Sequence, residues 1–150
     1  MSEEIINKVV RSPLQTIDLE EFYVAGERIS LDIKEQLFQG IALREKDFRE
    51  FIKTNDWASF EGKHVAIQCS ADAIVPTWAY MLLSIALKPF AKTILFGSLE
   101  ELETQLFKST LDTIDWSKYE NAKVVIKGCS KVKVPIATYV DVTSRLQPIA

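Results

Sequence analysis

The chain has 150 residues, of which 47% are hydrophobic and 26% charged, so it can form one folded domain with an ordinary core. Its 21 acidic and 18 basic residues give a net charge of −3, which argues against a general nucleic-acid-binding protein. No apolar run reaches the ~18 residues of a membrane span, and acidic residues follow Met1 where a secretion signal would be basic. Two cysteines make no disulfide framework, so we expect a reduced, cytoplasmic protein.

The first 40 residues differ from the rest in their pattern. Residues 27–33 alternate between apolar and polar side chains, as a half-exposed strand does. Residues 14–19 precede them across Gly26, a residue that suits a turn. We therefore expect an N-terminal antiparallel hairpin at one edge of the sheet.

A dense run of charges follows on a segment whose apolar spacing predicts a helix over residues 43–53. Opposite charges four residues apart, such as Glu45 and Arg49, are typical of a solvated helix face. A functional interpretation of the same run has Arg44 or Arg49 bind an anionic ligand or a partner. Both interpretations are open at this point.

Two stretches of the chain align when the sequence is shifted by about 59 residues. The shared features are Asp56-Trp57 and Asp115-Trp116, the strands 64–68 and 123–127, Cys69-Ser70 and Cys129-Ser130, and Val75-Pro76 and Val134-Pro135. Their common order predicts an internal duplication with units of about 43–97 and 98–150. The second unit lacks the strand that closes the first, so we expect a chain truncated after Ala150.

Strands and helices alternate through both units. The predicted elements are strand 64–68, helix 76–87, strand 93–97, a helix that begins at the Ser98–Glu101 capping box, strand 123–127 and helix 135–147. Helix 76–87 is apolar on nearly every side, which predicts burial. This alternation indicates an α/β fold with a mostly parallel sheet and helices on both faces, forming a single domain over 1–150.

Cys69 and Cys129 each lie just after a predicted strand and before a helix. Ligands bind at the carboxyl ends of strands in open parallel sheets, and a helix N-terminus favours an anion such as a thiolate. Both cysteines are therefore ligand or metal candidates. The residues that support them are Ser70, Ser130, Lys127, Lys131 and Lys133. Because its loop is rich in lysine and free of acid, Cys129 is the better candidate for an activated thiol.

The alternative is that both cysteines are small hydrophobes in the core. Two cysteines do not complete a four-ligand metal site, although neighbouring strands would let them chelate a metal or a cluster together. His64, the only histidine, begins its strand at the end opposite Cys69, which removes an ordinary Cys–His pair. Tyr80 and Tyr139 are assigned to core packing, the alternative being that their hydroxyls reach the strand ends. No nucleotide-binding glycine motif is present, so the sequence identifies no cofactor.

The chain resembles the bacterial family catalogued as domain of unknown function 2480. The resemblance covers essentially the whole chain and is carried by the runs Leu43-Arg44-Glu45-Lys46-Asp47-Phe48-Arg49, Cys69-Ser70-Ala71-Asp72-Ala73-Ile74-Val75-Pro76 and Val125-Ile126-Lys127-Gly128-Cys129. It implies a further strand and Cys-Ser beyond the position of Ala150, and a link to iron–sulfur cluster assembly. It implies no particular activity.

Three functions follow as hypotheses. The first is a non-enzymatic accessory or binding protein whose thiol loops hold a metal, a cluster or a sulfur species and whose acidic surface meets a protein partner. The second is a structural or interaction module without a ligand. The third is a small-molecule enzyme with Cys129 as nucleophile. None involves nucleic acid or a membrane, and the oligomeric state is open.

Overall fold

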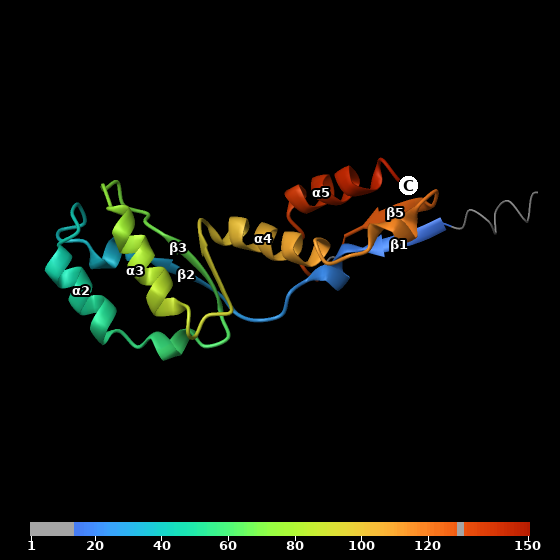
Figure 1. The fold of residues 1–150 in the computed structure, drawn as a ribbon. Coiled ribbons are helices and arrows are strands. Elements are labelled where there is room, and N and C mark those ends of the chain that lie inside the picture. The colour runs from blue at the N-terminus through green and yellow to red at the C-terminus, as the bar shows by residue number, and fades with distance from the viewer. Residues whose placement is uncertain (1–13, 129–130) are drawn as a thin grey trace, which may run out of the picture. The chain divides into compact units, whose positions relative to one another are not determined.

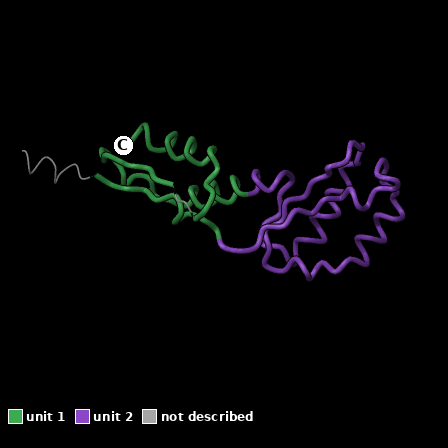
Figure 2. Tube along the Cα trace, turned by 180° about the vertical axis from the view of Figure 1, so that it is seen from behind, with its two compact units in different colours: residues 1–24, 103–150 green, residues 25–102 purple. Residues whose placement is uncertain are grey.

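A computed structural model describes residues 14–128 and 131–150 of the chain. The chain divides into two compact units, which Figure 2 shows in different colours. Unit 2 is the continuous segment Ala25–Leu102, and unit 1 combines Met1–Val24 with Glu103–Ala150. The single domain over 1–150 stays a prediction, and each unit is described by itself.

Unit 2 contains a parallel sheet of three strands in the order β2-β3-β4. The strands are β2 (Arg28–Asp32), β3 (His64–Gln68) and β4 (Thr93–Phe96), and the helices are α2 (Glu45–Thr54) and α3 (Thr77–Leu87). Short 3-10 helices follow β2 (Ile33–Gln36) and precede β3 (Trp57–Phe60). Helices and parallel strands alternate here as the sequence predicts.

The core of unit 2 lies on one face of this sheet, under α2 and α3 (Figure 1). Val65 and Ile67 point to this face from the central strand and are at most 3% exposed. Phe48 of α2 and Leu83 of α3 pack against them and are fully buried. Alternate residues of a strand point to one face, which is why a five-residue strand supplies two core side chains here.

Unit 1 contains a two-stranded parallel sheet with its own core. Its elements are β1 (Leu14–Asp18), β5 (Lys123–Lys127), α5 (Ile136–Leu146), the 3-10 helices Leu19–Phe22 and Trp116–Tyr119, and most of α4 (Leu99–Leu111). Ile17 pairs with Ile126 in the sheet, and Ile17, Leu111 and Val142 belong to the buried cluster of this unit. The predicted capping box starts α4, since Ser98 Oγ accepts from the Glu101 amide at 3.1 Å and Glu101 Oε1 accepts from the Ser98 amide at 3.1 Å.

The parallel sheets and their helices confirm the predicted α/β class, but the predicted antiparallel hairpin is wrong. β1 pairs in parallel with β5, and β2 pairs in parallel with β3, so the two N-terminal strands belong to different sheets. Each strand buries its apolar side against a later strand of the chain, which outweighs the local turn signal. Gly26 therefore does not form a hairpin turn. Its backbone lies close to the His64 ring instead, and a Cβ at this position would lie 2.8 Å from Nε2 of His64.

The same local structures recur at an offset of 59 residues. The bounds of β3 and β5 differ by 59, as do those of α3 and α5. The Trp57 indole donates to the Ile52 carbonyl at 2.7 Å, and the Trp116 indole donates to the Leu111 carbonyl at 3.0 Å. These equivalences are used below to compare the units, while the duplication as their origin stays a prediction.

Thr138 differs from its equivalent in a way that predicts a stabilising substitution. Its side chain is 2% exposed, and its Oγ1 has no hydrogen-bond partner within the described residues, whereas Ala79 lies at the equivalent position in unit 2. A buried hydroxyl without a partner costs free energy, so Thr138→Ala is expected to raise the free energy of unfolding by about 1 kcal/mol. Urea unfolding of both proteins measures this. A less stable Thr138→Ala would mean that the hydroxyl has a partner after all.

Candidate functional site: a thiol loop at the strand ends of unit 2

The carboxyl ends of β2 and β3 meet at one edge of the unit 2 sheet. The strands run in register, with Asp32 opposite Gln68, so the Cys69-Ser70 loop leaves β3 directly beside the end of β2. The loop then leads to Pro76, which caps α3 with an extended backbone. This is where open parallel sheets carry their ligand sites, as the sequence predicts for Cys69.

Asp32 fastens this loop to the neighbouring strand. Its Oδ1 accepts hydrogen bonds from the Lys34 amide at 3.0 Å and from the Ser70 amide at 3.1 Å. Its Oδ2 accepts from Ser70 Oγ at 2.5 Å. One carboxylate therefore caps the 3-10 helix after β2 and fixes the first residues of the thiol loop.

These contacts also set the charge of Asp32. Burial raises the pKa of its carboxyl, but the hydrogen bonds from the Ser70 hydroxyl and from the Lys34 and Ser70 amides outweigh burial. The pKa of Asp32 is therefore lower than usual, and the group is ionised at neutral pH. A charged acceptor makes stronger hydrogen bonds than a neutral one, so ionisation tightens the loop.

The thiol of Cys69 is partly exposed and close to a tyrosine. Its Sγ donates to the Ala71 carbonyl at 3.7 Å. Burial raises the pKa of Tyr80, and electrostatic interactions with Cys69 and Asp32 raise it further. The Tyr80 ring packs edge-on against Phe96 with 5.1 Å between centroids. Tyr80 thus packs as predicted, with its ring against the core of unit 2.

His64 is not available to this site. It is 1% exposed at the first position of β3, about 16 Å from Cys69 by five steps of ~3.3 Å along the strand. Its Nδ1 bonds Thr93 Oγ1 at 2.8 Å and its Nε2 bonds the Ala25 carbonyl at 2.8 Å. It lies at the far end of the strand, as the sequence predicts, and it cannot take a proton from the thiol.

The corresponding strand ends of unit 1 are described only in part, because Cys129 and Ser130 lie outside the described residues. Asp18 occupies the position of Asp32 and caps a 3-10 helix in the same way. Lys127 Nζ lies 3.9 Å from Asp18 Oδ2. The Tyr139 hydroxyl occupies the space that a Cβ at Gly128 would need, which explains a glycine there.

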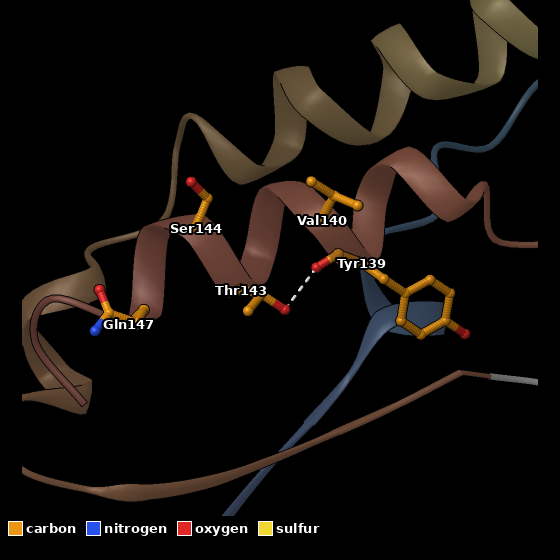
Figure 3. A pocket seen from close by; sticks show the side chains of 5 residues that line it. All are labelled: Tyr139, Val140, Thr143, Ser144 and Gln147. Carbon is orange, nitrogen blue, oxygen red and sulfur yellow. Dashed lines mark hydrogen bonds between the residues drawn. The ribbon is translucent and has the colours of Figure 1, made fainter.

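The other predicted residues of unit 1 lie around α5. Lys131 and Lys133 are exposed on the loop before this helix. Figure 3 shows a shallow pocket along α5, lined by Tyr139, Val140, Thr143, Ser144 and Gln147. In the same view, Thr143 Oγ1 donates to the Tyr139 carbonyl at 2.7 Å, so this polar group is used within the helix. Roles for these lysines stay predictions.

Arg44 and Arg49 lie at α2 rather than at the thiol loop. Arg49 Nε bonds Glu45 Oε1 at 3.0 Å, and its guanidinium lies 5.5 Å from the Trp78 ring centroid. The Arg44 guanidinium lies over the Phe38 ring, 3.3 Å from its centroid. These contacts are typical of a solvated helix face, while binding of an anion or partner by the two arginines stays a prediction.

A metal centre needs several ligands, and the described residues do not gather them. Among residues 14–128 and 131–150, no three His, Cys, Asp or Glu side chains are grouped closely enough to hold a metal ion. The oxygens of Asp32 already accept three hydrogen bonds. Because Cys129 lies outside the described residues, a metal held jointly by the two cysteines stays a prediction.

The fold and the site define an α/β protein with parallel sheets. At the end of one strand, the Asp32 carboxylate holds the Cys69-Ser70 loop in place. The family model described as protein of unknown function (DUF2480) matches residues 3–150, and the chain belongs to this family. Searches of curated proteins and of solved structures give no significant match. No helix in the described part of the chain has the length and apolarity to cross a membrane.

Proposed function

We propose that this protein is a non-catalytic accessory protein that binds a thiophilic ligand through the single sulfur of Cys69. The observation that carries the proposal is the loop itself: a partly exposed thiol at a strand end, held in place by a carboxylate. Cys69 packs partly against the core of unit 2, and the proposal concerns the part of its thiol that stays exposed. Partner binding and a cytoplasmic location belong to this proposal.

The one histidine of the chain does not reach Cys69. The nucleophile of a cysteine enzyme is activated by a neighbouring base or cation, and His64 is committed at the other end of β3. This favours a binding role over an enzyme.

The ligand is one that a single thiol can hold. A role in iron–sulfur cluster assembly would then be that of an accessory that supplies sulfur or binds a partner. With no group of metal ligands in the described residues, a sulfane sulfur suits Cys69 better than a metal ion.

The chemistry of sulfur uptake balances without another reactant. The Cys69 thiolate attacks the outer sulfur of a small-molecule persulfide, R–S–SH. A bond forms between Sγ and that sulfur, the bond between the two donor sulfurs breaks, and the donor leaves as the thiolate R–S⁻. The product is a Cys69 persulfide, which a partner can accept in the reverse exchange.

Intact-mass measurement tests the proposal. The native protein is incubated without oxygen with a low-molecular-weight persulfide, and separately with Cd²⁺ as a thiophilic metal. We expect the wild type to gain the mass of one sulfur atom at Cys69, and Cys69→Ser to lose that gain. Cys129→Ser is the matched control and is expected to retain it. If the wild type takes up neither sulfur nor Cd²⁺ through Cys69, the proposal is wrong. Uptake of Cd²⁺ alone would support a metal as the ligand.

A second function is favoured by the exposed apolar side chains of unit 2. Met81 and Ile85 lie one turn apart on α3 and are 64% and 68% exposed, and Phe96 of β4 is 65% exposed. The sequence predicts that this helix is buried on nearly every side. In the described structure this prediction is wrong for the side that carries Met81 and Ile85. Such residues suit a protein-interaction module. A double substitution of Met81→Glu and Ile85→Glu that abolishes partner capture while sulfur uptake continues would favour this module.

A further inference from the structure

We propose that the turn at residues 38–42 and the neighbouring Ile74 form the surface on which a partner protein docks to exchange sulfur with Cys69. The partner segment carries a cysteine next to apolar and acidic residues. This inference rests on the proposed function, since it concerns the protein that gives or takes the sulfur atom. The turn and the loop that carries Ile74 lie together at the end of unit 2 where α3 begins (Figure 1).

Backbone pairing joins this turn to the thiol loop. Phe38 and Ala42 form an antiparallel bridge, and Ala42 forms a parallel bridge with Ile74. The Phe38 amide donates to the Ala42 carbonyl at 2.6 Å. Ile74 lies on the loop that leads from Cys69 to α3. The surface of the turn is therefore continuous with the loop that presents the thiol.

The turn has an unusual backbone conformation. Its two central residues, Gln39 and Gly40, have positive φ values of 52° and 71°, as in a type I′ turn. The Ile41 amide donates to the Phe38 carbonyl across the turn at 3.1 Å. Glutamine rarely adopts a positive φ, and residues held in this region are found preferentially at functional sites. The turn is thus a fixed structure that presents its side chains in one arrangement.

The side chains presented here are large and apolar. Phe38 is 38% exposed, Ile41 is 64% exposed and Ile74 is 93% exposed. In the described structure, none of the three belongs to the core cluster of unit 2. Single exposed apolar residues are ordinary, but these three lie on two segments that the Ala42 bridge joins. Grouped apolar side chains of this kind are typical of a protein-binding surface.

The charge beside this surface favours an acidic partner. Arg44 follows the turn, and its guanidinium lies over the Phe38 ring, 3.3 Å from the centroid. Its side chain is exposed, and it forms no ion pair with any carboxylate in residues 14–128 and 131–150, whereas Arg49 bonds Glu45 at 3.0 Å. A guanidinium stacked on a ring keeps the N–H groups at its rim available for a carboxylate. A partner with apolar residues beside a carboxylate therefore complements both features.

The exchange reaction brings a protein partner onto this surface. The partner's cysteine thiolate attacks the outer sulfur of the Cys69 persulfide. A bond forms between the partner's Sγ and that sulfur, the bond from Cys69 Sγ breaks, and Cys69 leaves as the thiolate. A small persulfide needs only the exposed thiol, but a protein cysteine brings its neighbouring residues against Ile74 and the turn.

Sulfur transfer to three acceptor peptides tests the inference. All proteins are full chains that carry Cys129→Ser, so that Cys69 is the only thiol, and loading from a small persulfide is first measured by intact mass. Each peptide has one cysteine, flanked by leucine and glutamate in the first, by leucine and lysine in the second, and by serine and glutamate in the third. Each transfer rate is divided by the rate of the same peptide with the small persulfide alone, which removes differences between the peptide thiols.

We expect the leucine–glutamate peptide to accept sulfur about fivefold faster than the leucine–lysine peptide, because of the charge opposite Arg44. We expect it to react about tenfold faster than the serine–glutamate peptide, because of the apolar contact. Arg44→Glu is expected to reverse the first preference, and Ile74→Ser to remove the second. Lys53→Glu is the matched control, since it reverses an exposed charge at the other end of α2, and it is expected to keep both preferences.

The possible failures are distinguishable. A chain that takes up no sulfur at Cys69 would overturn the proposed function and this inference with it. A chain that loads normally but serves the three peptides at equal normalised rates would overturn this inference alone, as would an acidic preference that Arg44→Glu leaves unchanged. A preference that disappears as the protein concentration rises would mean that a second copy of the chain occupies the surface, which also contradicts the inference.

Discussion

Replacing Phe48 with alanine is expected to lower the free energy of unfolding of unit 2 by about 3–5 kcal/mol. Phe48 is 0% exposed and lies at the centre of an aromatic cluster. Its ring centroid is 6.0 Å from that of Phe51 and 5.9 Å from that of Trp78. Truncation removes these contacts and leaves a cavity between α2 and α3 that the packed rings cannot fill.

Urea unfolding followed by tryptophan fluorescence measures this loss, because Trp57 and Trp78 both lie in the affected cluster. Ile85→Ala is the matched control: Ile85 is 68% exposed on α3, so its truncation is expected to change stability by less than about 0.5 kcal/mol. Equal effects of the two substitutions would contradict the described core.

Replacing Asp32 with alanine is the second large effect expected. The change removes the acceptor of three hydrogen bonds and releases the thiol loop from β2. Because Asp32 is only partly buried, we expect a loss of about 1–2 kcal/mol in the free energy of unfolding. The larger consequence is functional: the Cys69 loop loses its fixed position, so sulfur uptake falls.

Asp32→Asn keeps the shape of the side chain and removes its charge. The pH dependence of the stability difference from the wild type therefore reports the effect of the charge. The pKa of Asp32 is lowered in the folded state, so its ionised form stabilises the protein above the unfolded-state pKa of about 3.9. That stability is lost as the pH falls through the still lower folded-state pKa. We therefore expect the wild type to be more stable than Asp32→Asn at pH 7, with the difference shrinking below about pH 4. A difference that does not change between pH 7 and pH 3 would mean that the charge plays no part.

The elements of the fold were predictable because their signals are local. The strand 64–68 and the helices that begin near Pro76 and Pro135 are where the pattern of apolar residues places them. Pairing was not predictable in the same way. β1 and β2 lie ten residues apart, yet each pairs with a strand that comes much later, because burial on the sheet decides pairing and no local pattern reports it.

The position of the thiol loop was predictable, because the loop directly follows a strand. The hydrogen bonds that join it to Asp32 were not predictable. Asp32 stands at the end of an alternating segment and looks like one more solvated residue. Its role depends on β2 lying in register beside β3, which sequence alone does not give. The available signal was the similar ending of two N-terminal strands, Thr-Ile-Asp-Leu at Asp18 and Ser-Leu-Asp-Ile at Asp32.

The most direct test of the account is to locate the sulfur atom after uptake. The wild-type protein, exposed to a small persulfide without oxygen, is alkylated and digested, and the peptides containing Cys69 and Cys129 are analysed by mass spectrometry. We expect a persulfide on Cys69 in the wild type, and a marked loss of that modified peptide in Asp32→Ala. A persulfide confined to Cys129, or an Asp32→Ala protein modified as fully as the wild type, would contradict the account.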